Sequence, residues 1–349
     1  MRILFGVQGT GNGHIARARA MQQSFENKNV AVDFLFSGRE RNKYFSMEPF
    51  GDFETRRGLT FCVDKGKVNY WQTAANNNLW QFRREVADLD LSGYDLVLND
   101  FEPVSAWAAK QQNITTIGIS HQNAFRYPIP VKGANWVDKK VVKYFAPTKF
   151  SIGLHWYHFD QPLLPPIIHT HGSQVIRHEA FVLVYLPFER LEAISDLLFR
   201  FTRQSFVCYH PEVSAPYQEE NIQYQPLSQP NFQHHLLRCG GVIANGGFEL
   251  PSEALSLGKK LLLKPLAGQF EQLTNVATLE HLGLAHSMDY LDASAVRDWL
   301  DEKQADQVQF PNVADAITEW ILSGEWHNSA SLSDQLWDKV NFPEYVSFS

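Results

Sequence analysis

The chain has 349 residues, of which 44% are hydrophobic and 20% charged, and its formal net charge is −7. This length indicates two domains rather than one core, and the acidic balance does not favour nucleic acid as a partner. The three cysteines lie far apart without a metal-binding spacing, which is typical of a reducing compartment. Gly6 comes too early for a signal peptide, and the longest apolar run, 180–187, is too short to span a membrane. We therefore expect a cytoplasmic protein.

Short apolar runs alternate with helical patterns along most of the chain. The runs lack polar alternation, as strands do when both faces of a parallel sheet are buried. Strands are expected at 3–7, 30–36, 96–98, 116–119, 150–154, 181–186, 206–209, 242–244 and 261–263. Helices are expected at 16–25, 190–202, 251–257, 270–281, 296–302 and 332–340. This order predicts an α/β protein built from doubly wound parallel sheets.

A proline-rich stretch at 161–166 marks the expected domain boundary, because proline cannot donate to a strand ladder. We expect a first domain at 1–160, a linker at 161–176 and a second domain at 177–325. A helical tail at 326–349 is expected to pack back on the first domain. The polar stretch 218–233 is interpreted as a strand edge followed by a loop.

The strand expected at 242–244 is followed by Asn245, Gly246, Gly247 and Phe248, where a helix opens. Two glycines let backbone N–H groups approach a ligand, and a helix N-terminus favours an anion such as a diphosphate. Glu253 lies in the first turn, where its carboxylate can accept hydrogen bonds from a ribose diol. An ordinary strand–turn–helix remains the alternative interpretation.

Polar loops also follow the strands of the first half, and ligands of open parallel sheets bind beyond such strand ends. His14 opens a helix after the first strand, and Asp100 ends the strand that begins at 96. Histidine is suited to take a proton from a hydroxyl near neutral pH, and a carboxylate can orient it. The alternatives are a structural hydrogen bond for His14 and a helix cap for Asp100.

The first loop also has part of a dinucleotide-binding pattern. Gly9 and Gly11 fit it, but His14 stands where a third glycine is usual, and no acid ends the second strand. Arg39 follows that strand and could meet the phosphate of NADP. An NADP enzyme is therefore a third-ranked alternative.

Two sets of residues resemble the GT-B superfamily of nucleotide-sugar glycosyltransferases. The chain is most similar to the branch of UDP-glycosyltransferases and the peptidoglycan N-acetylglucosaminyl transferase, within a bacterial or archaeal subgroup. The first set belongs to the second domain and comprises 240–247, 252–255, Gly258, Pro265, Glu271, Gln272 and Asn275. The second set belongs to the first domain and comprises Gly11, Asn12, Gly13, His14, Asp100, Pro103 and His121 to Asn123.

The resemblance implies two Rossmann-like domains that face each other across a cleft, with the donor on the second. Glu253 would hold the ribose of a UDP donor, and the backbone of Gly246 and Gly247 would bind the diphosphate. Many relatives have histidine at the position of Asn245, so that contact would be neutral here. Glu271 and Gln272 would contact the donor sugar, although their spacing from Pro265 is longer than usual.

On the acceptor side the resemblance implies that His14, oriented by Asp100, deprotonates the acceptor hydroxyl. The remaining acceptor-side loop residues would be Gly11, Asn12, Gly13 and His121. The implied reaction is an inverting sugar transfer from a nucleotide-diphosphate sugar without a metal or other cofactor. The helix N-terminus near Phe248 would stabilise the negative charge of the leaving diphosphate. Asp88 and Asp90 precede a strand, so we interpret them as a solvated helix end rather than a metal site.

Two other functions stay open at this stage. A UDP-sugar 2-epimerase would share the donor site without needing an acceptor, and a catalytically inactive nucleotide-sugar-binding protein would bind the donor without turnover. The acceptor itself, whether a glycan, a lipid-linked molecule or a small molecule, does not follow from the sequence.

A helical pattern at 134–145 places Trp136, Val137, Val141, Tyr144 and Phe145 on one side, with three lysines on the other. Such a helix can rest on an anionic membrane and bring a lipid-linked acceptor near His14. The plainer interpretation, which we favour at this stage, is an amphipathic helix with its apolar face in the core.

Overall fold

The computed structural model describes residues 1–60, 63–64, 67–68, 77–168 and 176–348. The chain divides into two compact units, each described by itself below. Unit 1 comprises Met1–Cys62, Asn69–Thr170 and Phe310–Val340, and unit 2 comprises Val63–Val68, His171–Gln309 and Asn341–Ser349. The change of unit after Thr170 falls within the expected linker, of which 169–175 lies outside the described residues. Residues 310–325, expected in the second domain, instead belong to unit 1, and the last nine residues belong to unit 2.

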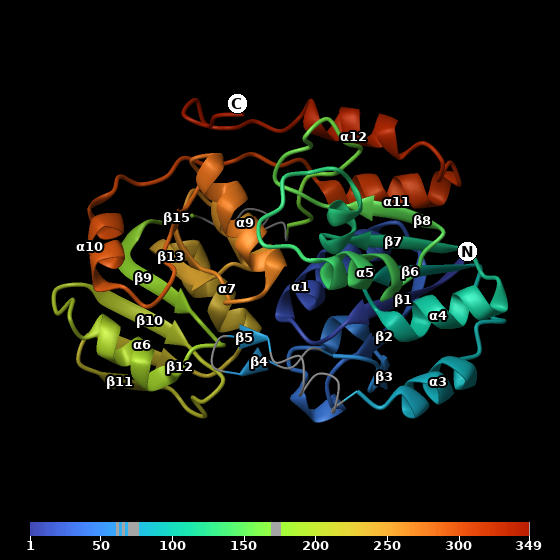
Figure 1. The fold of residues 1–349 in the computed structure, drawn as a ribbon, viewed down its shortest axis with the longest axis horizontal. Coiled ribbons are helices and arrows are strands. Elements are labelled where there is room, and N and C mark those ends of the chain that lie inside the picture. The colour runs from blue at the N-terminus through green and yellow to red at the C-terminus, as the bar shows by residue number, and fades with distance from the viewer. Residues whose placement is uncertain (61–62, 65–66, 69–76, 169–175, 349) are drawn as a thin grey trace. The chain divides into compact units, whose positions relative to one another are not determined.

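Unit 1 contains a six-stranded parallel sheet in the order β3-β2-β1-β6-β7-β8 (Figure 1). Strands β6 and β7 are buried throughout and β1 beyond its first residue, which explains why their sequences are apolar without alternation. The strands are β1 Arg2–Gln8, β2 Ala31–Ser37, β3 Glu54–Arg56, β6 Leu96–Asp100, β7 Thr116–Ser120 and β8 Phe150–Gly153.

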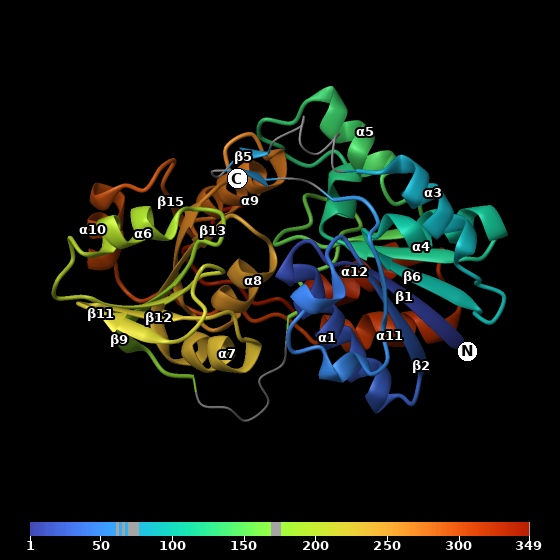
Figure 2. The same cartoon turned by 90° about the horizontal axis from the view of Figure 1, so that it is seen from below.

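Helices cover both faces of this sheet. The helices α3 and α4 pack against one face through a core that includes Leu4, Val97 and Val104, and α1 and α11 lie on the other side (Figure 2). The helices are α1 Asn12–Asn27, α3 Leu79–Asp88, α4 Pro103–Gln112, α5 Trp136–Tyr144, α11 Val313–Ser323 and α12 Ser329–Trp337. Short 3-10 helices occupy Arg41–Lys43, Glu48–Phe50 and Gln122–Arg126.

The two C-terminal helices of unit 1 are fixed by contacts between residues far apart in the sequence. Ser24 Oγ donates to Asp315 Oδ1 at 2.5 Å, which ties α11 to α1. Ser333 Oγ and Trp337 Nε1 both donate to the carbonyl of Leu163, at 2.6 and 2.7 Å, which ties α12 to the same unit. These contacts explain why α11 groups with unit 1 rather than with the residues that precede it.

Helix α5 places only part of its apolar side in the core, so the plainer interpretation of 134–145 is correct for some of its residues only. Val141 and Phe145 pack against a buried cluster of unit 1 that contains Phe101. Trp136, Val137 and Tyr144 are 69%, 37% and 54% exposed, and Val142 is the buried residue of the helix. The helix begins with a capping box formed by Asn135 and Asp138. Its position is therefore set by its start, by Val142 and by Phe145, whose ring stacks on that of Phe101 with the ring centres 4.9 Å apart.

Unit 2 contains a seven-stranded sheet in the order β11-β12-β10-β9-β13-β14-β15. All neighbours are parallel except the edge strand β11, which is antiparallel to β12. The strands are β9 Glu179–Tyr185, β10 Ser205–Tyr209, β11 Tyr217–Glu219, β12 Ile222–Gln225, β13 Cys239–Asn245, β14 Lys260–Lys264 and β15 His286–Ser287. A separate antiparallel pair is formed by β4 Val63–Asp64 and β5 Lys67–Val68.

Helices cover the unit 2 sheet as well. The helices α6 and α10 supply Ile194, Val296 and Trp299 to the core of one face. The stretch 218–233 was expected to be a strand edge plus a loop. It contains part of the edge strand β11, which confirms the strand edge, then β12 and the start of α7, a helix that was missed. The helices are α6 Leu191–Leu198, α7 Gln229–Arg238, α8 Glu249–Ser256, α9 Phe270–His281 and α10 Ala293–Asp301.

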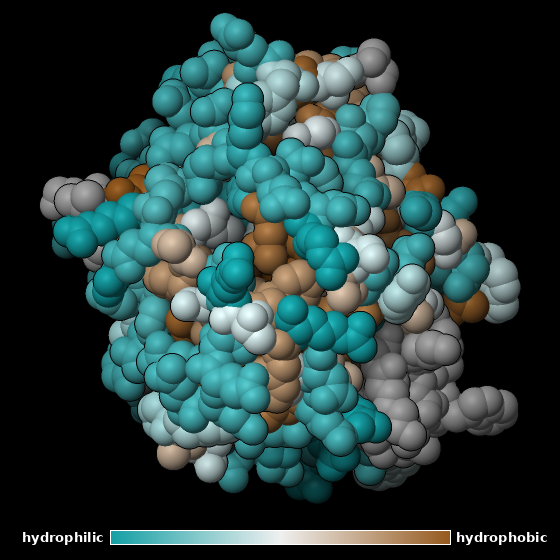
Figure 3. Space-filling model, turned by 90° about the vertical axis from the view of Figure 1, so that its left-hand side faces the viewer, coloured by the Kyte–Doolittle hydropathy of each residue, from teal (hydrophilic) through white to brown (hydrophobic). Residues whose placement is uncertain are grey.

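The side of the molecule drawn in Figure 3 carries hydrophilic side chains over most of its surface. Within the described residues, no helix combines the length and the apolar character that crossing a membrane requires.

Candidate active site

His14 lies in the first turn of α1, directly beyond the carboxyl end of β1. Gly11 is the N-cap residue, with extended backbone and no side-chain cap. A Cβ at Gly11 would meet only His14 Cδ2, at 3.9 Å, so the space over this turn is open. A ligand can therefore approach the start of α1 next to His14, whose side chain is 15% exposed.

The structure brings His14 and Asp100 together and adds Arg17 to them. His14 Nδ1 lies 2.8 Å from Asp100 Oδ1. Arg17 donates from Nε to Asp100 Oδ2 at 2.8 Å and from Nη2 to Asp100 Oδ1 at 2.9 Å. The side chains of Arg17 and Asp100 are 3% and 0% exposed, so the pair is held inside unit 1 with only His14 reaching the surface.

This arrangement selects one tautomer of His14. Because an ionised carboxylate can only accept hydrogen bonds, the short contact with Asp100 requires the proton of the imidazole on Nδ1. Arg17 Nη2 also lies 3.0 Å from Nδ1, but a protonated Nδ1 has no lone pair to accept its hydrogen, and Nη2 donates to Asp100 Oδ1. The opposite nitrogen, Nε2, is then unprotonated and can act as a base.

The charge of Asp100 is maintained by its neighbours. Burial raises the pKa of its carboxyl, but the charges of Arg17 and His14 and the hydrogen bonds from both outweigh burial and hold the pKa below its usual value. Asp100 does not cap a helix, the alternative role considered above. Glu102 is the N-cap of α4, accepting from the backbone of Val104 and Ser105 at 2.8 and 2.6 Å.

Sequence reasoning missed Arg17, although a signal was present. Arg17 stands three residues after His14, and residues at that spacing are neighbours on one face of a helix. A histidine and an arginine on one helix face, together with an aspartate at the end of a strand in the same half of the chain, could have indicated a network of three residues.

The other predicted residues of unit 1 have different surroundings. Arg39 donates to Asn12 Oδ1 at 3.2 Å and to the carbonyl of Gly9, so it is held against the loop that precedes α1. His121 is 1% exposed, and its Nδ1 lies 2.8 Å from the carbonyl of Leu154. His121 therefore lies inside the unit, which does not favour a contact with an acceptor.

In unit 2 the two predicted glycines differ in their surroundings. A Cβ at Gly246 would lie 2.7 Å from Val276 and 2.9 Å from the carbonyl of Gln272, so glycine is required there for packing against α9. A Cβ at Gly247 would meet nothing within 4 Å. Helix α8 begins just after this open position, with Phe248 as its N-cap residue and no side-chain cap, and a helix N-terminus is favourable for an anion.

Asn245 is anchored in a way that limits its chemistry. Its Nδ2 donates to the carbonyl of Lys264 at 3.0 Å, and its Oδ1 is buried without a partner among the described residues. The amide nitrogen is thus committed, which does not favour donation to a phosphate. Lys264 itself pairs with Glu189 at 2.7 Å, and both side chains are largely buried. This ion pair at the strand ends had no signal in the sequence.

The predicted donor carboxylate Glu253 is held by a neighbouring helix. Because α8 begins at Glu249, Glu253 lies in its second turn rather than in the first turn as expected. Gln233 of α7 donates from Nε2 to Glu253 Oε2 at 2.8 Å, and Glu253 is 4% exposed. Gln272 is buried and accepts from the backbone of Leu266 at 3.0 Å, so it fixes the loop before α9. Glu271 lies in the first turn of that helix and is partly exposed.

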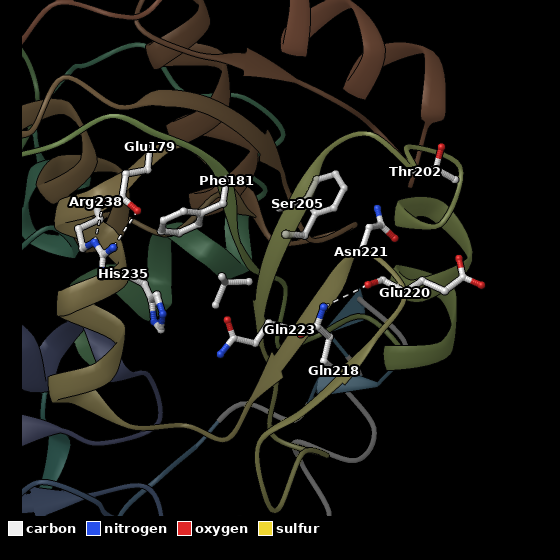
Figure 4. A pocket seen from close by; sticks show the side chains of 12 residues that line it. Glu179, Phe181, Thr202, Ser205, Gln218, Glu220, Asn221, Gln223, His235 and Arg238 are labelled. Atoms are coloured by element: carbon white, nitrogen blue, oxygen red, sulfur yellow. Dashed lines mark hydrogen bonds and ion pairs between the residues drawn. The ribbon is translucent and has the colours of Figure 1, made fainter.

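A cavity of about 720 Å³ in unit 2 contains none of the predicted residues (Figure 4). It lies over β10 and β12, which are joined through β11 instead of a helix, so this part of the sheet is uncovered. Two of its charged groups pair with each other: Arg238 donates to Glu179 at 2.8 and 2.9 Å. We therefore assign it no part in the chemistry of the predicted residues.

The described residues contain no cluster of three or more histidine, cysteine, aspartate or glutamate side chains able to hold a metal ion. Asp88 is the last residue of α3, and Asp90 accepts from the backbone of Ser92 at 2.9 Å. This is the helix end expected for the Asp-Leu-Asp stretch.

Comparison with known proteins identifies the family and the fold. The family model described as glycosyl transferase family 1 matches residues 1–303. A comparison with curated proteins gives no match. Among similar solved structures is SsfS6 from Streptomyces sp. SF2575 with thymidine diphosphate, at 13% identity, 96% coverage of each chain and a TM-score of 0.58.

Two further structures resemble the chain over nearly its whole length. The glycosyltransferase SnogD from Streptomyces nogalater is 16% identical, with 97% of this chain and 99% of that chain covered and a TM-score of 0.54. Arabidopsis thaliana UGT89C1, complexed with quercetin, is 12% identical, with 96% and 94% covered and a TM-score of 0.58. At these identities the likeness concerns the fold, which is the expected GT-B fold of two Rossmann-like units. Because the family model covers most of the chain, the protein belongs to glycosyl transferase family 1 and is a glycosyltransferase.

Proposed function

We propose that the protein transfers a sugar from a nucleotide-diphosphate sugar, specifically a UDP-sugar, to an acceptor hydroxyl with inversion at the anomeric carbon. The observation that carries this proposal is the network of His14, Asp100 and Arg17. It places an imidazole with a free Nε2 at an open helix start, held by a buried carboxylate. This is the arrangement that a general base for an alcohol needs.

In the proposed step the acceptor oxygen forms a bond to the anomeric carbon while the bond from that carbon to the diphosphate oxygen breaks. The hydroxyl proton passes to Nε2 of His14, and Asp100 stabilises the resulting imidazolium. The electron pair of the broken bond leaves with the diphosphate. We assign stabilisation of this negative charge to the N-terminus of α8 next to Gly247, without a metal or another cofactor.

The donor is proposed to bind on unit 2. The open space at Gly247 supports contact between a diphosphate and the backbone, and Glu253 is proposed to accept hydrogen bonds from the ribose. Glu271 in the first turn of α9 is the better placed of the two predicted sugar contacts, because Gln272 is buried and already bonded to Leu266. For Asn245 we propose a supporting role rather than a phosphate contact, because its amide nitrogen is committed.

A thermal-shift panel with UDP, dTDP, GDP, ADP and NADP tests the donor side. A ligand that binds only the folded state at a hundredfold excess over Kd adds about 2.7 kcal/mol of stability. We expect a shift with UDP that is lost in Glu253→Ala and kept in Glu192→Ala, an exposed glutamate of the same unit. A shift with NADP alone would contradict the proposal, and Arg39, already bonded to Asn12 and Gly9, gives no support to that outcome.

The acceptor is proposed to be the hydroxyl of a glycan, a lipid-linked molecule or a small molecule in the cytoplasm. Helix α5 is proposed to make a weak contact with an anionic membrane. Trp136 and Tyr144 are exposed next to Lys140 and Lys143, whose ammonium groups lie 4.8 and 5.2 Å from the two rings. Exposed aromatic and lysine side chains together suit the interface of an anionic bilayer.

Sedimentation with vesicles of phosphatidylglycerol or phosphatidylcholine at low salt tests this contact. We expect binding to the anionic vesicles only, and its loss in Lys139→Glu/Lys140→Glu. The control Lys303→Glu/Lys339→Glu makes the same change in net charge at exposed lysines elsewhere. Equal binding by the two double variants, or no binding by the wild type, would rule out α5 as a membrane contact.

A further inference from the structure

A partly buried hydrogen bond between side chains joins helices α7 and α8. Gln233 of α7 donates from Nε2 to Oε2 of Glu253 at 2.8 Å. Glu253 lies in the middle of α8, is 4% exposed and belongs to the residues proposed to bind the donor. The orientation of its carboxylate therefore depends on a residue from another helix.

The direction of this bond is fixed by chemistry. If the amide of Gln233 were turned over, its oxygen would face the carboxylate, and two acceptors would oppose each other. In the observed orientation, Oε1 of Gln233 is buried and accepts no hydrogen bond from the described residues. Buried polar atoms without a partner are uncommon and call for an explanation. The amide of Gln233 thus keeps the orientation in which it donates to Glu253, although its oxygen then has no hydrogen-bond partner among the described residues.

A positioned carboxylate matters for binding a diol. A carboxylate has about four acceptor positions, and the bond from Gln233 uses one of them. A free glutamate side chain loses rotamer freedom when it binds a ligand, and a neighbour that fixes it beforehand removes that cost. Gln233 can therefore increase the affinity for a ribose without touching it.

We propose that Gln233 is a positioning residue that holds Glu253 for the 2′,3′-diol of the donor, so that the protein selects ribonucleotides over 2′-deoxyribonucleotides. This proposal rests on the proposed function, in which Glu253 binds the ribose of a nucleotide sugar. The sequence alone did not indicate it, because Gln233 precedes Glu253 by twenty residues and lies in a stretch expected to be a loop.

The test compares the affinities of UDP and 2′-deoxy-UDP by isothermal titration calorimetry. The wild type should bind UDP about 10- to 100-fold more tightly, the range of one hydrogen bond to a charged group. Gln233→Met keeps the length of the side chain but removes the donor. It should reduce the preference to within about threefold by weakening UDP, while the affinity for 2′-deoxy-UDP changes by less than about threefold. The control Gln223→Met changes an exposed glutamine of β12 in the same unit and should keep the wild-type preference.

The outcomes separate this proposal from the proposed function. Binding of UDP by the wild type with loss of the preference in Gln233→Met supports both. An unchanged preference in Gln233→Met, or an equal loss for both ligands, overturns the positioning role but leaves the donor site in place. Failure of the wild type to bind UDP overturns the proposed donor and this inference with it. If Gln233→Met does not fold, Gln233→Asn, whose amide is one methylene too short to reach Glu253, provides the same comparison.

Discussion

Replacing Arg17 with methionine removes the cation that pairs with Asp100 and keeps a long apolar side chain. Arg17 makes two hydrogen bonds to the carboxylate, at 2.8 and 2.9 Å, and both side chains are almost fully buried. Asp100 would then stay buried with His14 as its remaining partner among these three residues. Removing one partner of a buried ion pair lowers the free energy of unfolding by about 3–5 kcal/mol, and we expect a loss in this range.

Urea unfolding followed by tryptophan fluorescence measures this loss. Among the residues that the structure describes, every tryptophan except Trp299 belongs to unit 1, so the signal reports mainly on the unit that contains the pair. In Arg17→Met/Asp100→Asn both charges are gone, and the amide oxygen can still accept from His14. The double variant should therefore lose at least about 2 kcal/mol less than the sum of the single variants. Arg83→Met, at an exposed position of α3, is the control and should change stability by less than about 0.5 kcal/mol.

Two results would refute this reasoning. A loss below about 1 kcal/mol in Arg17→Met would mean that Asp100 does not depend on the guanidinium. Additive losses in the single and double variants would mean that the two side chains are not energetically coupled. Either result would also weaken the argument for the tautomer of His14, because that argument requires an ionised Asp100.

Three further predictions follow from the surroundings of single residues. Because the folded pKa of Asp100 is lowered, its contribution to stability is present above its unfolded pKa of about 3.9 and is lost as the pH falls through the folded value. Between about pH 5 and about pH 3 the wild type should thus lose more free energy of unfolding than Asp100→Asn, and an equal loss in urea titrations would contradict this. Gly246→Ala should lower the melting temperature, because the added Cβ would lie 2.7 Å from Val276. Gly247→Ala should leave the melting temperature unchanged and only weaken the thermal shift caused by UDP. Equal melting temperatures for the two variants would be inconsistent with these contacts. Burial raises the pKa of the Cys208 and Cys239 thiols to about 12, so iodoacetamide should not modify them in the folded protein, and mass spectrometry that finds either one alkylated would disprove it.

The buried strands and most helices could be predicted because their residues have to satisfy local rules. The runs 3–7 and 116–119 are apolar without alternation, and they form β1 and β7 in parallel sheets. The helix predicted at 270–281 is α9 with the same bounds. The helix α7 was missed because its apolar positions are sparse and Pro230 suggested a loop, although proline is favoured in the first turn of a helix. The place of α11 in unit 1 could not be predicted, since it depends on Ser24 and Asp315, which are 291 positions apart.

The sequence allowed the residues of the candidate site to be predicted, but not the contacts that surround them. Strand ends and glycines pointed to His14, Asp100 and Gly247, because these features follow from the order of strands and loops. Arg17 and Gln233 act through contacts between different elements, and no local pattern reveals which side chains meet there. Burial was also invisible: the sequence does not indicate that His121 lies inside unit 1.

The central claim is that His14 removes the proton from an acceptor alcohol during sugar transfer. The most direct measurement follows UDP released from a panel of UDP-sugars, with and without a panel of sugar, flavonoid and lipid-linked sugar acceptors that each carry a free hydroxyl, in the wild type and in His14→Ala. We expect release that depends on an acceptor and falls about a hundredfold or more in His14→Ala. The affinity for UDP should stay within about threefold of the wild type, because the residues proposed to bind the donor belong to unit 2. Acceptor-dependent release at the wild-type rate in His14→Ala, or release that no acceptor accelerates, would contradict it.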